Sequence, residues 1–84
     1  MPIISRFNGI VIRMYFQQSE HNPPHVHAYY GNSVAAISIS DAKILEGSLP
    51  PKALDIVKQW IKTNSTELMD IWNTQIFRYI PPLE

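Results

Sequence analysis

The stretch that decides the fold reads His25-Val26-His27-Ala28-Tyr29-Tyr30-Gly31-Asn32-Ser33-Val34-Ala35-Ala36-Ile37-Ser38-Ile39. Its two ends, residues 25–30 and 34–39, are rich in the β-branched and aromatic residues that are typical of strands. Between them, Gly31-Asn32-Ser33 is a run of turn-forming residues. The pattern predicts two antiparallel strands joined as a hairpin, because so short a connection cannot join parallel strands.

A second strand pair is predicted before this hairpin. Residues 10–16 alternate between one apolar face and a second, mixed face. The apolar face consists of Ile10, Ile12, Met14 and Phe16, and the other face of Val11, Arg13 and Tyr15. Residues 3–7 form a shorter strand, and Asn8-Gly9 is the two-residue type I′ turn between the two strands. Residues 17–24 are a polar loop that ends in two prolines.

The rest of the sheet is predicted to follow the hairpin directly. Asp41-Ala42 forms a turn, and residues 43–47 form a short last strand. All the connections are short, so each strand is expected to pair with its neighbour in sequence. The sequence therefore predicts a curved antiparallel β-meander of four to five strands.

After Gly47 the apolar residues recur with helical spacing. A first helix is predicted with Ser48 as its N-cap and Pro50-Pro51 in its first turn, where the missing N–H of proline leaves nothing unpaired. Its apolar stripe consists of Ala53, Leu54, Ile56, Val57, Trp60 and Ile61.

A second helix is predicted after an interruption at residues 63–65. Asn64 and Glu67 have the spacing of a capping box at its start. Its apolar face consists of Leu68, Ile71, Trp72 and Ile76, and Pro81-Pro82 ends all regular structure. Trp60 and Trp72 both lie on apolar faces, so we expect both side chains in the core.

Together these elements predict an α+β fold in which two helices pack on one face of the meander. The 84 residues are expected to form a single domain, 1–84, with one core. Apolar residues make up 45% of the chain and charged residues 17%, which argues against disorder. The low charged fraction leaves apolar surface exposed, and this favours a partner protein or a homo-oligomer.

Charge and composition exclude several classes of protein. Seven basic residues balance seven acidic ones, so the basic excess of a dedicated nucleic-acid binder is absent. The first forty residues nevertheless hold Arg6, Arg13 and all three histidines against Glu20 alone. The absence of cysteine excludes disulfides, thiolate zinc sites and a cysteine nucleophile. There is no signal-peptide pattern and no apolar run near the roughly 20 residues of a membrane span, so we expect a cytoplasmic protein.

The strand at residues 25–30 is where we expect any chemistry to lie. Alternate side chains of a strand share a face, so His25, His27 and Tyr29 project together. Val26, Ala28 and Tyr30 are predicted to point into the core. Two imidazoles and a phenol on one exposed strip form an unusual group, and the preceding Pro23-Pro24 fixes the backbone where the strand begins.

The leading chemical hypothesis is general acid–base cleavage of an RNA phosphodiester. The pKa of an ordinary histidine lies near neutrality, so His25 and His27 can exchange protons at physiological pH. Tyr29 and an arginine of the neighbouring strands, Arg6 or Arg13, would stabilise the charge that develops on the phosphate. RNA binding without cleavage would use the same residues.

Three alternatives stay open. A transition-metal site would use the pair His25 and His27 with His21 as a third imidazole, although the only acids near them in sequence are Glu20 and Asp41. No other cofactor is expected. A non-catalytic module would dock another protein on the same aromatic surface. In the third alternative, His25 and His27 have no chemical role and are exposed or hydrogen-bonded residues that only stabilise the loop.

Three segments carry a resemblance to a known family. Residues 1–16 read Met-Pro-Ile-Ile-Ser-Arg-Phe-Asn-Gly-Ile-Val-Ile-Arg-Met-Tyr-Phe, residues 23–31 read Pro-Pro-His-Val-His-Ala-Tyr-Tyr-Gly, and residues 45–54 read Leu-Glu-Gly-Ser-Leu-Pro-Pro-Lys-Ala-Leu. With Trp60 and Trp72, this ordered combination resembles the small prokaryotic family called domain of unknown function 4160. The resemblance covers essentially the whole chain.

The resemblance implies a partner rather than a mechanism. Members of the family are often encoded beside a second small protein, and such pairs have been proposed as toxin–antitoxin modules. The chain would then be the candidate toxin, or one partner of a two-protein complex. The positions that match the family pattern are Arg6, Gly9, Arg13, Pro24, His25, His27, Ala28, Tyr30 and Gly31. Residues 17–22 form a longer loop than the pattern has, which weakens a role for His21.

Overall fold

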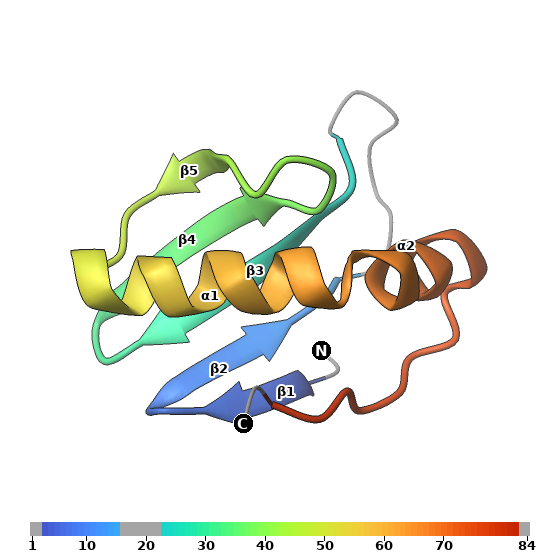
Figure 1. Cartoon of the computed structure of the whole chain (residues 1–84), viewed down its shortest axis with the longest axis horizontal. Coiled ribbons are helices and arrows are strands. Elements are labelled where there is room, and N and C mark those ends of the chain that lie inside the picture. Colours follow the sequence, from blue (N-terminus) through green and yellow to red (C-terminus); the bar gives the residue numbers. More distant parts are fainter. Residues whose placement is uncertain (1–2, 16–22, 83–84) are drawn as a thin grey trace.

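A computed structural model describes residues 3–15 and 23–82. Five strands form one antiparallel sheet in the order β1-β2-β3-β4-β5, and two helices follow. The elements are β1 (Ile3–Phe7), β2 (Ile10–Arg13), β3 (His25–Tyr30), β4 (Ser33–Ser38), β5 (Ile44–Gly47), α1 (Pro51–Thr63) and α2 (Ser65–Thr74). Figure 1 shows α1 crossing one face of the sheet and α2 continuing beside the end where β2 stops. The predicted α+β meander with two helices is confirmed.

The tight turn between β1 and β2 is the one that the sequence predicts. Asn8 and Gly9 both have left-handed backbones, with φ values of 49° and 78°, as a type I′ turn requires. Gly9 also lies against the ring of Tyr30. A Cβ atom added at Gly9 would be 3.3 Å from the Cε1 atom of that ring. Tyr30 itself is 39% exposed. The prediction that it points into the core is wrong, because it is the last residue of β3 and its ring lies at the rim beside this turn.

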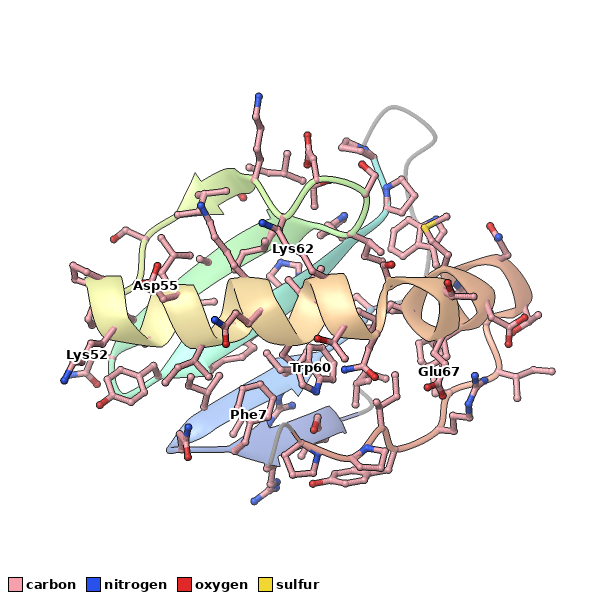
Figure 2. The ribbon with its side chains drawn as sticks, viewed as in Figure 1. Phe7, Lys52, Asp55, Trp60, Lys62 and Glu67 are labelled. Carbon is pink, nitrogen blue, oxygen red and sulfur yellow. The ribbon has the colours of Figure 1, made fainter. Side chains whose placement is uncertain are left out.

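The core lies between the helices and the sheet face that they cover. From the sheet it includes Ile4, Ile10, Ile12, Met14, Val26, Ala28, Ala35, Ile37 and Ile39, and from the helices Ala53, Val57, Trp60, Ile61, Leu68, Ile71 and Trp72. Trp60 is fully buried and its ring centroid lies 5.5 Å from that of Phe7, which joins α1 to β1 (Figure 2). Trp72 is also buried, so the prediction of two core tryptophans is confirmed.

The helix caps differ from the predicted ones. α1 begins after Pro50, and Ser48 is not its cap but donates its backbone N–H to the carbonyl of Val34. Asn64 precedes α2, yet its side-chain amide donates to the carbonyl of Trp60 rather than taking part in a capping box. Asn64 thus caps the carboxyl end of α1, where its backbone N–H bonds the same carbonyl, whereas Ser48 is held by a strand that the local sequence pattern does not reveal.

The chain turns back after α2, and this corrects the prediction for Ile76. Gln75 has a left-handed backbone with φ of 59° and ends the helix at Thr74, so Ile76 lies outside the helix and is 68% exposed. Ile80 enters the core instead, with 1% exposure.

The C-terminal segment, residues 75–82, runs beside β1. The N–H of Ile80 donates to the carbonyl of Ile4 over 2.7 Å, and the N–H of Arg6 donates to the hydroxyl of Tyr79 over 3.3 Å. The indole N–H of Trp60 donates to the carbonyl of Pro81. These bonds use backbone groups of β1 that face away from β2, so the segment occupies that outer edge of the sheet.

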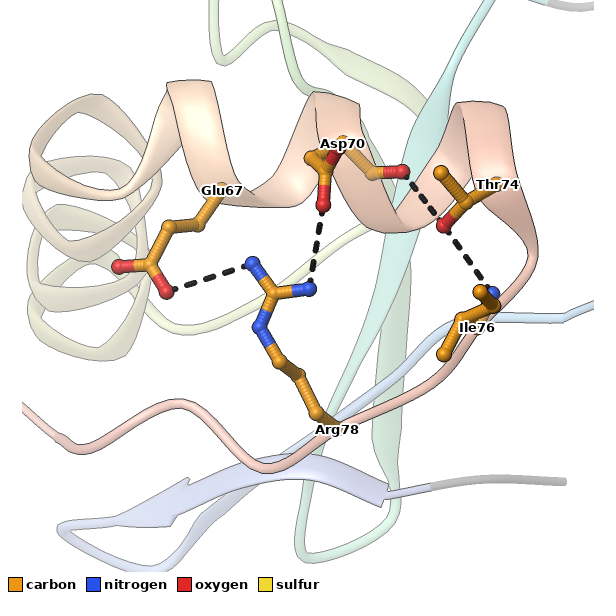
Figure 3. A network of polar contacts seen from close by, with 5 residues as sticks. All are labelled: Glu67, Asp70, Thr74, Ile76 and Arg78. Carbon is orange, nitrogen blue, oxygen red and sulfur yellow. Dashed lines mark hydrogen bonds and ion pairs between the residues drawn. The ribbon is translucent and has the colours of Figure 1, made fainter.

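A surface network holds the same segment to α2 (Figure 3). The guanidinium of Arg78 reaches Asp70 at 3.2 Å and Glu67 at 3.5 Å. The hydroxyl of Thr74 donates to the carbonyl of Asp70 and accepts the N–H of Ile76. All of these charged groups are well exposed, so the ion pairs contribute little free energy compared with the burial of Ile80. Within residues 3–15 and 23–82, neither helix has the length and apolar character needed to cross a membrane.

Candidate functional site

The helices leave one face of the sheet uncovered, and we call this the open face. Its side chains come from the strand positions that alternate with the core positions: Arg6, Val11, Arg13, His25, His27, Tyr29, Val34, Ala36 and Glu46. Across the strands, Arg13 lies opposite His27, His27 opposite Ala36, and Ala36 opposite Glu46. The prediction that His25, His27 and Tyr29 share a face is confirmed, because the three are half-buried while Val26 and Ala28 between them are fully buried.

A series of ring contacts runs through this face. The ring of Tyr15 stacks on that of His27, with centroids 4.5 Å apart and planes inclined by 23°. His27 and His25 meet edge to face at 5.2 Å. His25 in turn lies 5.3 Å from the ring of Trp72, which comes from α2. His25 therefore contacts both His27 on the open face and Trp72, a core residue of α2.

A tyrosine pair extends the series on the other side. The hydroxyls of Tyr15 and Tyr29 are hydrogen-bonded to each other. The guanidinium carbon of Arg13 lies 5.5 Å from the centre of the Tyr29 ring, within the range of a cation–π contact. The hydrogen bond that the Tyr29 hydroxyl donates to Tyr15, together with burial, raises the pKa of Tyr29, and the charge of Arg13 opposes this only in part. Tyr29 is therefore a neutral phenol at physiological pH.

Burial sets the protonation of His27. It lowers the pKa of this imidazole below its ordinary value of 6.5, and the neighbouring His25 lowers it further. The carboxylate of Glu46 acts in the opposite direction. The Nδ1 atom of His27 is buried and has no hydrogen-bond partner among the described residues. His27 is therefore a neutral imidazole, and thus a proton acceptor, at neutral pH.

The backbone before β3 fixes the orientation of His25. Its Nδ1 atom lies 2.9 Å from the carbonyl oxygen of Pro23. A carbonyl only accepts hydrogen bonds, so Nδ1 carries a proton and the second ring nitrogen, Nε2, is left for other partners. Pro23, one of the two prolines predicted to fix the start of the strand, thus also supplies the acceptor that orients the imidazole.

Two adjoining hollows open beside the histidines. The larger has a volume of about 350 Å³ and is lined by His25, His27, Ala36, Leu45 and Glu46. The smaller has a volume of about 230 Å³ and is lined by His27, Val34, Ala35, Ala36, Glu46 and Gly47. The two hollows share His27, Ala36 and Glu46. Because the side chain of Ala36 is small, it leaves space between the side chains of His27 and Glu46. A molecule in the larger hollow would touch both imidazoles.

The predicted site residues are not all brought together. His25, His27, Tyr29 and Arg13 form one connected cluster. Arg6 shares their sheet face, but it lies on the edge strand opposite Val11, which separates it from Tyr29. His21 lies outside the described residues.

Sequence reasoning missed three residues that take part in the site. Tyr15 was visible as a member of the Arg13 face, but its contacts depend on how β2 is placed beside β3. Glu46 lies two strands from His27, and its place follows from pairing that no local pattern reveals. Trp72 was predicted only as a core residue, yet it also contacts His25.

The described residues do not include a group of three or more histidine or acidic side chains close enough to hold a metal ion. Two predicted ligands, His25 and His27, are in contact, whereas the third, His21, lies outside those residues. Asp41, the acid considered as a further ligand, forms no such group with the two histidines. Its carboxylate accepts hydrogen bonds from the hydroxyl of Ser38 and the N–H of Lys43, and the bond from Ser38 is the main cause of its lowered pKa.

The fold and the open face together define a small α+β domain whose uncovered sheet presents a histidine and tyrosine cluster. A family model described as "Domain of unknown function (DUF4160)" matches residues 9–73. The chain belongs to this family. The matched range includes β2 to β5, α1, all of α2 except its last residue, and every residue of the cluster. Neither the curated proteins nor the solved structures provide a match to the chain.

Proposed function

We propose that this chain cleaves RNA at the open face of its sheet, as one component of a two-protein pair of the toxin–antitoxin type. The observation that carries the proposal is that His25 and His27 line the same hollow, with Arg13 directly opposite His27 on the next strand. Two imidazoles in one cavity and a nearby guanidinium are the groups that a general acid–base cleavage of a phosphodiester needs.

The two histidines have different roles in this proposal. His27 is the base, since burial keeps it neutral, and it takes the proton of the RNA 2′-hydroxyl. The 2′-oxygen then bonds to phosphorus while the bond from phosphorus to the 5′-oxygen breaks. His25 is the acid in its doubly protonated form: Nδ1 keeps its proton in the bond to the Pro23 carbonyl, and Nε2 gives the second proton to the departing 5′-oxygen. The products are a 2′,3′-cyclic phosphate and a 5′-hydroxyl.

Arg13 and Tyr29 assist by charge and hydrogen bonding. The guanidinium of Arg13 stays protonated and offers paired donors to the phosphate oxygens. Tyr29 keeps its proton at neutral pH because its pKa is raised; one proton lies in the bond between the Tyr29 and Tyr15 hydroxyls, so the second hydroxyl proton of this pair is the one offered to a phosphate oxygen. Arg6, at the edge of the same face, would contact the RNA backbone farther along the strand.

The test uses purified protein and an end-labelled single-stranded RNA of mixed sequence. We expect cleavage that leaves cyclic phosphate ends and spares the same oligonucleotide with 2′-deoxyribose. His25→Ala and His27→Ala should each lower the rate by roughly 10²-fold or more, the usual contribution of one acid or base. Arg78→Gln, which removes an arginine that pairs with α2 and lies outside the cluster, is the matched control. Folded His25→Ala protein that cleaves at the wild-type rate would overturn the proposal.

A metal-dependent version of the site is tested in the same assay. His25 keeps Nε2 available as a ligand and His27 lies beside it. If a metal assists, cleavage should stop in a chelator and return with zinc or nickel, and elemental analysis should find stoichiometric metal in protein purified without chelators. Cleavage that is unchanged by a chelator would reject this version.

A second candidate function is partner binding without catalysis, which the edge strand β5 favours. All four of its residues are exposed, including Ile44 at 38% and Leu45 at 44%. Exposed apolar residues on an edge strand are unusual in a free monomer. The small protein encoded beside the gene is the expected partner. Tight co-purification with this protein, combined with no RNA cleavage and no growth inhibition, would favour the second function over the first.

A further inference from the structure

The larger hollow on the open face contains a carboxylate that the proposed cleavage does not use. Glu46 lies opposite Ala36, which lies opposite His27, so the carboxylate and the imidazole stand on either side of an alanine. Strands are spaced by about 4.8 Å, which leaves roughly 10 Å between the backbones of the two outer residues. This is enough width for a flat ring to lie over Ala36.

An irregularity in β5 places two of its side chains at this hollow. The register shifts between Ala36, opposite Glu46, and Ile37, opposite Ile44, so Leu45 is an extra residue. Such a bulge re-aims neighbouring side chains, and both Leu45 and Glu46 line the hollow. Gly47 permits it: its φ is 78°, and a Cβ there would lie 2.2 Å from the carbonyl oxygen of Val34.

The walls of the hollow have a definite chemistry. Leu45 and Ala36 are apolar, and the imidazoles of His25 and His27 present ring surfaces. Glu46 is the single acidic group that lines it, and the ion pairs found among the described residues, both of Arg78, do not involve it. The hollow thus suits a flat, uncharged ring with hydrogen-bond donors on one edge.

We propose that this hollow is the subsite for the base next to the cleaved phosphate, and that Glu46 selects guanine. The proposal rests on the proposed cleavage of RNA at His25 and His27. Guanine carries two donors side by side, N1–H and an N2–H, and a carboxylate accepts both with its two oxygens. Adenine and cytosine present one amino donor beside an acceptor nitrogen, which the carboxylate repels. Uracil presents one donor between two carbonyls.

The binding test uses the full chain and the four ribonucleoside 3′-monophosphates, followed by NMR. We expect the guanosine nucleotide to bind roughly tenfold more tightly than the others or better, as one bidentate pair allows. Glu46→Gln removes half of the acceptor pair and should abolish the preference. Glu67→Gln, another exposed glutamate, is the matched control and should keep it. Equal binding of all four nucleotides, no binding of any, or a preference that survives Glu46→Gln would overturn the subsite.

A cleavage map separates this proposal from the function on which it rests. Wild-type protein should cut a mixed-sequence RNA on the 3′ side of guanosines, and Glu46→Gln should cut at all four bases. Cutting without base preference in the wild type overturns the subsite and leaves the cleavage function standing. A guanine preference in binding, with no cutting at any site, overturns the cleavage function and supports the subsite as a nucleotide-binding site.

Discussion

The ring of Tyr15 stacks on the ring of His27, with centroids 4.5 Å apart and planes inclined by 23°. This contact joins the segment just after β2 to the middle of β3 and covers one side of the imidazole. It therefore contributes to the burial that lowers the pKa of His27. A residue outside the predicted site thus helps to set the protonation of the proposed base.

Removing this cover should return the pKa of His27 toward its ordinary value. In Tyr15→Ala the imidazole becomes more exposed, so its charged form is better solvated and the pKa should rise. In Tyr15→Phe the ring stays in place and the pKa should change little. An NMR titration of the histidine ring protons measures both. Equal pKa values of His27 in wild type and Tyr15→Ala would show that Tyr15 does not bury it.

The lowered pKa of His27 should make stability depend on pH. The unfolded chain has the ordinary value of 6.5, so between that value and the lower folded pKa the unfolded state binds more protons. The free energy of unfolding should therefore rise with pH across this window and fall as the solution is acidified through it. Urea midpoints measured for wild type and His27→Gln give the test. The difference between the two should change through this range, whereas a constant difference would contradict it.

Two glycines with similar backbones should respond very differently to alanine. Gly31 has φ of 59° and open space around it, so Gly31→Ala should lose only the left-handed penalty of about 1 kcal/mol. Gly47→Ala adds a contact of 2.2 Å with a backbone oxygen and should lose roughly 3 kcal/mol or more. Chemical denaturation of both variants measures the difference. Equal losses would mean that β5 can move away from β4 at little cost.

Two isoleucines of the C-terminal segment form a second matched pair. Ile80 is 1% exposed, and Ile80→Ala should destabilise the protein by about 2–4 kcal/mol. Ile76 is 68% exposed, and Ile76→Ala should change stability by less than about 0.5 kcal/mol. Thermal and urea unfolding of the two variants gives the comparison. A large loss for Ile76→Ala would place that side chain in the core, as helical spacing alone suggests.

Sequence reasoning works best where the controlling interactions are local. The type I′ turn at Asn8-Gly9 follows from two residues that tolerate a left-handed backbone, and strand alternation is enough to place His25 and His27 on one face. The buried stripe of α1 is read from spacing alone. Each of these features involves residues within one element or one turn.

Contacts between distant elements could not be predicted in this way. Alternation assigns Arg13 to a face, but only the register of β2 with β3 places it opposite His27. The bulge that brings Glu46 to the histidines depends on the close approach of Gly47 to β4. Ile76 fits the helical pattern of α2, yet the left-handed Gln75 stops the helix before it. These outcomes depend on the packing of the whole chain rather than on propensity.

The C-terminal segment also limits how many molecules can join through their sheets. Its bonds to Ile4 and Arg6 occupy the outer edge of β1, whereas the residues of β5 at the opposite edge are all exposed. A sheet with one available edge can accept a single strand from a neighbour, and two such sheets joined at β5 present no second edge for a third. Edge-to-edge association therefore stops at a pair and cannot extend into a filament while the segment remains in place.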